Sequence, residues 1–118
     1  MTLSHMAKHD PNLSLIFQAL SDPTRRAMLA MLGQGAVPVS DLARPTGLAL
    51  PTILRHLAVL ESAALITTEK TGRTRLCRAC PRTLAATADW LTEQRANWES
   101  QTDRLESYLA TLQKGPTP

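Results

Sequence analysis

The spacing of apolar side chains divides the sequence into helical segments separated by proline and glycine. Residues 13–20 and 23–32 repeat apolar side chains at intervals of three or four, as amphipathic helices do. Asn12 and Asp22 stand where a side chain can cap a helix N-terminus, and Pro23 suits a first helical residue. The chain is therefore predicted to begin with two short helices joined by a tight connection.

The middle of the chain predicts a short extended piece and two more helices. Residues 37–39 are extended, and Ser40 caps a brief helix over residues 41–44. A longer helix covers residues 51–63 and opens on Pro51. Its inward-facing residues, at intervals of three to four, are Ile53, Leu57, Leu60 and Ala64.

The pattern then changes to alternation, which is typical of strands. Strands are predicted over residues 65–69 and 73–78, with residues 70–72 as the hairpin turn. A long final helix follows over residues 81–113. Its apolar stripe repeats every seven residues, at Leu84, Leu91, Trp98, Leu105 and Leu112. The predicted order, α-α-(β)-α-α-β-β-α, is a mostly α fold with a small β-hairpin wing, a winged helix-turn-helix.

Length and composition fit this fold. A chain of 118 residues is the size of one domain, and aromatic residues make up only 3%, which favours an aliphatic, helical core. We expect a DNA-binding core and wing over residues 12–80, a dimerisation helix over 81–113, and flexible ends at 1–11 and 114–118. The sequence has no run of about 18 apolar residues and no cleavable signal, so a cytoplasmic protein without membrane contact is expected.

The net charge of +3 is unevenly distributed. Residues 1–82 hold ten basic and five acidic side chains, whereas residues 83–118 hold three basic and five acidic ones. The most basic stretch, residues 70–82, contains no acid. This distribution favours binding of a polyanion by the first part of the chain. The alternative for the basic hairpin is a solvated surface that prevents edge-to-edge strand pairing.

The helix over residues 51–63 carries candidate base contacts opposite its apolar face. Arg55 can bind guanine O6 and N7, and an exposed Leu50 or Leu54 can contact a thymine methyl. Both leucines can instead pack within the fold, and His56 is either a base contact or a packed side chain. The candidate DNA-binding residues are Ser40, Leu50, Pro51, Thr52, Leu54, Arg55, His56, Lys70, Arg73 and Arg75. Arg25 and Arg26 are further candidates for phosphate contact, or else structural partners within the fold.

Two cysteines, Cys77 and Cys80, have the spacing of a zinc ligand pair or a redox-active pair. Arg78 and Arg82 are expected to lower the pKa of these thiols. The alternative is structural, because Cys77 stands at an inward position of its strand, where a small apolar residue is common. No thioredoxin-like pattern surrounds the pair, which disfavours a thiol-disulfide oxidoreductase.

The last helix needs an apolar partner, because its stripe is longer than a small domain can cover. Part of the stripe can pack on the first helix, and the remainder is expected to contact a second copy of the chain. The candidate dimerisation residues are Leu13, Phe17, Leu84, Trp90, Leu91, Trp98, Leu105 and Leu109.

Three segments resemble the ArsR-type family of winged-helix repressors. Residues 20–26 (LSDPTRR) resemble the opening signature of that family, and residues 48–60 (LALPTILRHLAVL) resemble its recognition helix. Residues 63–66 (AALI), with the later Gly72-Arg73, resemble its strand and wing. Residues 89–91 (DWL), with Trp98, resemble the autorepressor-type branch. The sequence departs from the family at Ala49, Leu54 and Ala64, where many members have a Ser cap, a Ser facing DNA and a Gly.

The resemblance implies a homodimeric transcriptional repressor that binds a palindromic operator. Metal-sensing members have a Cys-x-Cys pair on the first helix of the helix-turn-helix, or His residues on the last helix. Residues 39–42 contain no thiol and no His follows His56, so neither metal site carries over and no cofactor is expected. We expect double-stranded DNA and a second copy as partners, and no enzymatic activity. The alternatives are a repressor switched by thiol or metal chemistry at Cys77 and Cys80, a thiol-disulfide oxidoreductase, and a dimeric interaction module without DNA binding.

Overall fold

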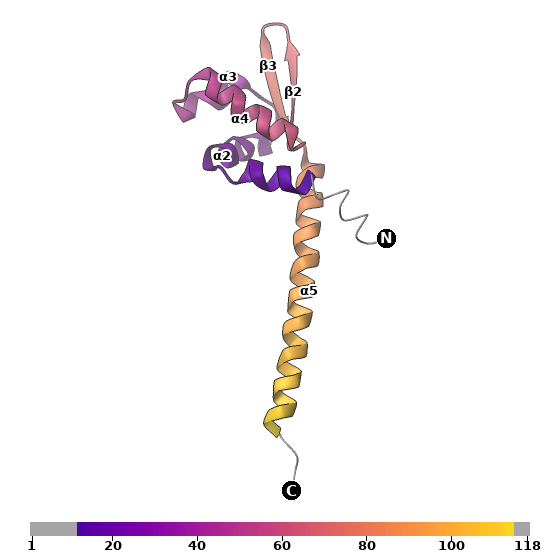
Figure 1. The fold of residues 1–118 in the computed structure, drawn as a ribbon. Coiled ribbons are helices and arrows are strands. Elements are labelled where there is room, and N and C mark those ends of the chain that lie inside the picture. The colour runs from indigo at the N-terminus through magenta and orange to yellow at the C-terminus, as the bar shows by residue number, and fades with distance from the viewer. Residues whose placement is uncertain (1–11, 115–118) are drawn as a thin grey trace. The chain divides into compact units, whose positions relative to one another are not determined.

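The computed structural model describes residues 12–114, which divide after Leu84 into two compact units (Figure 1). The first unit holds the helices and the sheet, and the second is the rest of the last helix. Residues 12–20 are helical. The later elements are α2 (Pro23–Met31), β1 (Val37–Pro38), α3 (Val39–Ala43), α4 (Leu50–Ser62), β2 (Ile66–Thr71), β3 (Thr74–Ala79) and α5 (Pro81–Lys114), with 3-10 turns at Leu32–Gln34 and Arg44–Thr46. The predicted mostly α fold with a small wing is confirmed.

The start of α2 follows from local chemistry. The Asp22 carboxylate accepts a hydrogen bond from the backbone N–H of Arg25 (3.0 Å), and Pro23 is the first helical residue. This bond holds the pKa of Asp22 below its ordinary value, and the positive charge of Arg25 acts in the same direction. The cap therefore favours an ionised carboxylate at the positive end of the helix dipole.

The start of α3 differs from the prediction. The helix begins at Val39, directly after β1, and Ser40 lies inside it as an exposed residue, not as its cap. The reason is long-range pairing, because Val37 and Pro38 lie opposite Cys77 and Leu76 of β3. The extended piece therefore ends at Pro38, and Val39 is buried as the first residue of the helix.

The core of the first unit is aliphatic. The predicted inward residues Ile53, Leu57 and Leu60 of α4 are buried, as expected. They belong to a cluster that also contains Ile16, Ala19, Met28, Leu29, Leu32, Val39, Leu42, Ala63, Leu65, Ile66 and Cys77. Removal of this apolar surface from water drives the packing of α4 against α2 and the sheet.

Ala64 is not part of this core. It is exposed and has a positive φ of 59°, where glycine is favoured. Its N–H donates to the carbonyl of Glu61 (2.9 Å), and the N–H of Leu65 donates to that of Leu60 (3.0 Å). This pair of bonds is the Schellman motif, which satisfies the last carbonyls of α4 and turns the chain into β2.

The sheet is antiparallel in the order β1-β3-β2, and the β2-β3 hairpin projects from the helices (Figure 1). Thr71 pairs with Thr74, so the turn consists of Gly72 and Arg73 rather than the predicted residues 70–72. Gly72 has a φ of 62°, which a residue with a side chain rarely adopts. β2 is therefore one residue longer than predicted, β3 keeps its predicted length but begins one residue later, and the turn places Arg73 at the tip of the wing.

The last helix, α5, is 34 residues long and ends at Lys114, one residue past the predicted end. Within the described residues, no helix is both long enough and apolar enough to cross a membrane. From Leu91 to Leu112 the apolar side chains of α5 are exposed, and Trp98 is the most exposed of them, at 71%.

Candidate DNA-binding interface

The α4 helix presents an exposed face opposite its buried one. Its first turn contains Leu50 and Pro51, both exposed, so the helix begins one residue earlier than predicted. Leu50 is 55% exposed and Leu54 is 45% exposed, so neither side chain is packed inside the fold. Thr52 is half-buried and Arg55 is exposed. An apolar and a cationic group therefore lie together on one solvent-facing surface.

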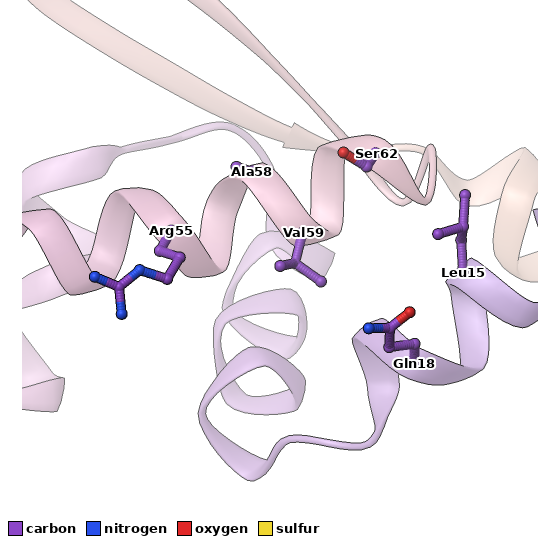
Figure 2. Close-up of a pocket in the computed structure, with 6 residues that line it drawn as sticks. All are labelled: Leu15, Gln18, Arg55, Ala58, Val59 and Ser62. Carbon is purple, nitrogen blue, oxygen red and sulfur yellow. The ribbon is translucent and has the colours of Figure 1, made fainter.

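An open groove of about 290 Å³ runs beside this surface, between α4 and the first helix (Figure 2). Arg55 and Val59 extend from the same side of α4 in this view. Among the described residues Arg55 has no hydrogen bond or ion pair, so its guanidinium is available to an external group. The groove is lined by Leu15, Gln18, Arg55, Ala58, Val59 and Ser62.

The tip of the hairpin is the second cationic surface. Arg73 follows Gly72 in the turn, and Lys70 lies in β2 two residues before Gly72. Both side chains are exposed and have no ion pair with any residue that the structure describes. Free cations at a narrow loop tip suit contacts with phosphates or with the minor groove.

Arg75, the third predicted cation of the wing, is held in place by neighbours that the sequence did not indicate. Its guanidinium donates to Thr68 Oγ1 (2.9 Å), and Thr68 donates to Glu61 Oε2 (3.2 Å) near the end of α4. These bonds connect the wing to α4, because Arg75 and Thr68 are diagonal neighbours on the paired strands β3 and β2. A basic residue and a threonine on paired strands are a weak signal for such a link, because many surface pairs share it.

The structure assigns Arg25 and Arg26 to packing within the fold. Arg26 donates to the carbonyl of Leu20 (2.7 Å), and Arg25 donates to the carbonyl of Ala19 (2.8 Å). The side chain of His56 is only 17% exposed and lies against Arg25. Of the two alternatives for His56, a base contact or a packed side chain, its low exposure and its contact with Arg25 favour the packed side chain.

The two cysteines are free thiols with different surroundings. Cys77 is fully buried in the core, and burial raises its pKa, with a further increase from the charge of Glu61 that Arg75 partly offsets. The expectation that neighbouring arginines lower the pKa is therefore wrong for Cys77. Its thiol is held in the protonated, unreactive form.

The geometry of β3 also separates the two thiols. Cys77 lies within the strand, and the N–H of Cys80 continues the ladder by bonding to the carbonyl of Leu65 (2.9 Å). An extended chain rises about 3.3 Å per residue, which places the two Cα atoms about 10 Å apart. A disulfide needs less than roughly 7 Å. In the described part of the chain no three His, Cys, Asp or Glu side chains gather as a metal site.

The residues predicted for dimerisation are mostly exposed. Leu84, Leu91, Trp98, Leu105 and Leu109 lie along α5 with large exposed fractions, and Trp90 is partly exposed on the same helix. Phe17 is 39% exposed on the first helix, and Leu13 is half-buried there. The exposed apolar side chains of α5 are therefore available to contact another apolar surface.

Comparison with known proteins finds the same architecture. A family model described as a helix-turn-helix domain matches residues 20–69. A crystal structure of an ArsR family transcriptional regulator is 45% identical with a TM-score of 0.73, over 77% of this chain and 94% of that one. An ArsR-like transcriptional regulator from Rhodococcus sp. RHA1 is 30% identical with a TM-score of 0.77, over 86% of this chain and 95% of that one.

Two curated relatives are transcriptional regulators by name. The HTH-type transcriptional regulator Rv2034 of Mycobacterium tuberculosis is 39% identical over 59% of this chain and 65% of its own length. The transcriptional repressor SdpR of Bacillus subtilis is 36% identical over 49% of this chain and 64% of its own length. The chain thus spans slightly less than two thirds of either relative. With the match to nearly whole solved chains, these similarities establish that the protein belongs to the ArsR family of winged-helix transcriptional regulators.

Proposed function

We propose that the protein is a homodimeric repressor that binds a palindromic DNA operator and has no enzymatic activity or cofactor. The observation that carries this proposal is the pair of unpaired cationic surfaces, Arg55 on α4 and Lys70 with Arg73 on the wing. Polyanion binding needs free cations on surfaces that can reach the phosphates and the groove. The name of SdpR, a transcriptional repressor, supports repression as the outcome of binding.

In this proposal α4 enters the major groove and the hairpin tip lies beside it. Arg55 binds guanine O6 and N7, while Leu50 and Leu54 contact thymine methyl groups. The wing cations bind phosphates or the minor groove. Ser40, Pro51 and Thr52 lie near the start of the two helices and supply contacts to the backbone. Arg75 also contacts the DNA backbone in this proposal, but its side chain is less mobile because it donates a hydrogen bond to Thr68.

The second copy of the chain is proposed to cover the apolar stripe of α5. A stripe that repeats every seven residues is suited to pairing with another helix. A solution structure from Mycobacterium bovis with the same fold is described as a homodimeric winged helix-turn-helix DNA-binding domain, which supports this arrangement. Two-fold symmetry would place two recognition helices about one turn of DNA apart, about 34 Å.

The test is DNA binding by the full chain. Fluorescence anisotropy is measured with labelled duplexes of about 30 base pairs, enough for two half-sites, that tile the region upstream of its own coding sequence. We expect one duplex to bind at nanomolar concentrations and to out-compete a scrambled duplex by at least about 1,000-fold.

Two variants make this test specific. Arg55→Ala should weaken the specific complex by about ten-fold or more, since a bidentate contact to guanine is worth about 1–3 kcal/mol. The control Arg104→Ala, a change of the same kind on α5, should bind like the unchanged protein. Absence of preferential binding to any duplex, or equal binding by Arg55→Ala, would contradict the proposal.

A further inference from the structure

One guanidinium joins three helices of the first unit. Arg25 of α2 donates from Nε to the carbonyl of Ala19 (2.8 Å) and from Nη2 to the carbonyl of Gln18 (3.0 Å). Its remaining nitrogen, Nη1, lies 3.2 Å from Nδ1 of His56 on α4. The carbonyls at the end of the first helix, which lack partners within that helix, are thus bonded by the same side chain that contacts the recognition helix.

The chemistry of this contact sets the direction of its hydrogen bond. Arg is always a donor and never an acceptor, so Nδ1 of His56 is the acceptor. A second group faces the same atom, because Oδ2 of Asp22 lies 4.0 Å from Nδ1. Arg25 and Asp22, the residue that caps α2, are the charged groups that the structure places against His56, while the first helix contributes only backbone carbonyls bound to Arg25.

The position of His56 links this contact to DNA recognition. It follows Arg55 directly in the sequence and lies one helical turn after Thr52, so the rotation of α4 about its axis sets the direction of all three side chains. Apolar packing at Ile53 and Leu57 fixes the buried side of α4 without hydrogen bonds. The Arg25–His56 contact adds a directional constraint to that packing.

We propose that Arg25 and His56 are positioning residues that hold α4 in the orientation that presents Arg55 to DNA. The inference rests on the proposed DNA-binding function.

Arginine 25 has a matched control in its neighbour. Arg26 lies on the same helix and donates to the carbonyl of Leu20, but no bond joins it to α4. Arg25→Lys keeps the positive charge but loses the planar guanidinium, whose three nitrogens contact three acceptors at once. We expect about a ten-fold loss of affinity for the specific duplex, an effect of the size of one oriented contact. Arg26→Lys should bind within about two-fold of the unchanged protein, with both variants shown to be folded by circular dichroism.

Variants at His56 separate positioning from mere stability. His56→Gln retains a side-chain acceptor for the Arg25 guanidinium, and His56→Leu removes it. We expect His56→Leu to lose about as much DNA affinity as Arg25→Lys, and His56→Gln to recover part of that loss.

The outcomes distinguish this inference from the function on which it rests. If the unchanged protein binds no duplex specifically, the proposed function fails. If it binds, but Arg25→Lys binds equally well or Arg26→Lys loses as much affinity, the positioning role is overturned. Equal losses of affinity in His56→Gln and His56→Leu would overturn the role of the acceptor on His56.

Discussion

The arginines of α2 and the cations of the wing differ in what their charges contact. Arg25 and Arg26 donate to backbone carbonyls at the end of the first helix, so their hydrogen-bonding capacity is used inside the fold. Lys70 and Arg73 have no such bonds to any described residue. Each pair adds two positive charges to the chain, but of the two pairs only that of the wing is free to bind an external anion. The hydrogen bonds thus distinguish cations that can serve the proposed DNA contact from cations that are used within the fold.

The largest expected effect is the loss of DNA affinity when the free cations of the wing are removed. Lys70→Ala combined with Arg73→Ala should weaken the specific complex by about ten- to a hundred-fold and reduce the slope of log affinity against log salt by about two, one for each lost phosphate contact. Thermal stability should be unchanged. Anisotropy titrations at several salt concentrations measure both quantities. The matched double change Arg104→Ala with Lys114→Ala on α5 should leave the slope intact, and a reduced slope there would contradict the assignment.

The next prediction compares the two regions by stability, where we expect the larger loss from the α2 arginine. Arg25→Ala should lower the free energy of unfolding by about 1–2 kcal/mol, because the Ala19 carbonyl and a half-buried histidine lose their charged donor, whereas the Gln18 carbonyl still accepts from the N–H and Oγ of Ser21. Arg73→Ala should change it by no more than about 0.5 kcal/mol. Urea unfolding followed by circular dichroism tests the pair. Equal losses in the two variants would show that the two arginines do not differ in structural role.

A third change tests whether stability and DNA binding can be separated. Ala64→Gly should raise the free energy of unfolding by about 0.5–1 kcal/mol, because a left-handed φ of 59° is strained for alanine, while added freedom in the unfolded chain offsets part of the gain. Thermal unfolding measures it, and DNA affinity should stay unchanged. A destabilised protein would show that the turn after α4 is not strained.

The smallest effect concerns the acid dependence of the α2 region. The folded state lowers the pKa of Asp22, chiefly through the backbone N–H of Arg25, so its carboxylate stabilises the fold above about pH 4 and that contribution is lost as the pH falls further. Asp22→Asn still caps the helix but does not titrate. Between pH 6 and pH 3 the melting temperature of this variant should therefore fall less steeply than that of the unchanged protein. Equal slopes in the two proteins would contradict a stabilising role of the ionised Asp22 carboxylate.

Local signals allowed most of the fold to be predicted from the sequence. The Asp22-Pro23 start of α2 and the buried face of α4 depend on neighbours within one or two turns, and both predictions were confirmed. Errors arose where distant pairing decides the outcome. The start of α3 is set by the pairing of β1 with β3, and the register of the hairpin moves its turn to Gly72-Arg73.

The candidate site was predictable only in part for the same reason. The exposure of Leu50, Leu54 and Arg55 follows from helical periodicity, which the sequence displays. The contact between Arg25 and His56 joins residues 31 positions apart, and periodicity within either helix carries no signal for it. The pKa of Cys77 likewise depends on burial in the folded core, whereas the neighbouring arginines in the sequence indicated the opposite direction.

The most direct test of the account is a map of the DNA-contacting surface in solution. Backbone amide chemical shifts of the full chain are compared with and without the specific duplex from its own upstream region. The account predicts the largest changes in the first two turns of α4 and at residues 70–75 of the wing, with small changes along α5 beyond residue 91. Large changes confined to α5, with α4 and the wing unaffected, would contradict the claim that free cations on these two elements form the DNA-binding surface.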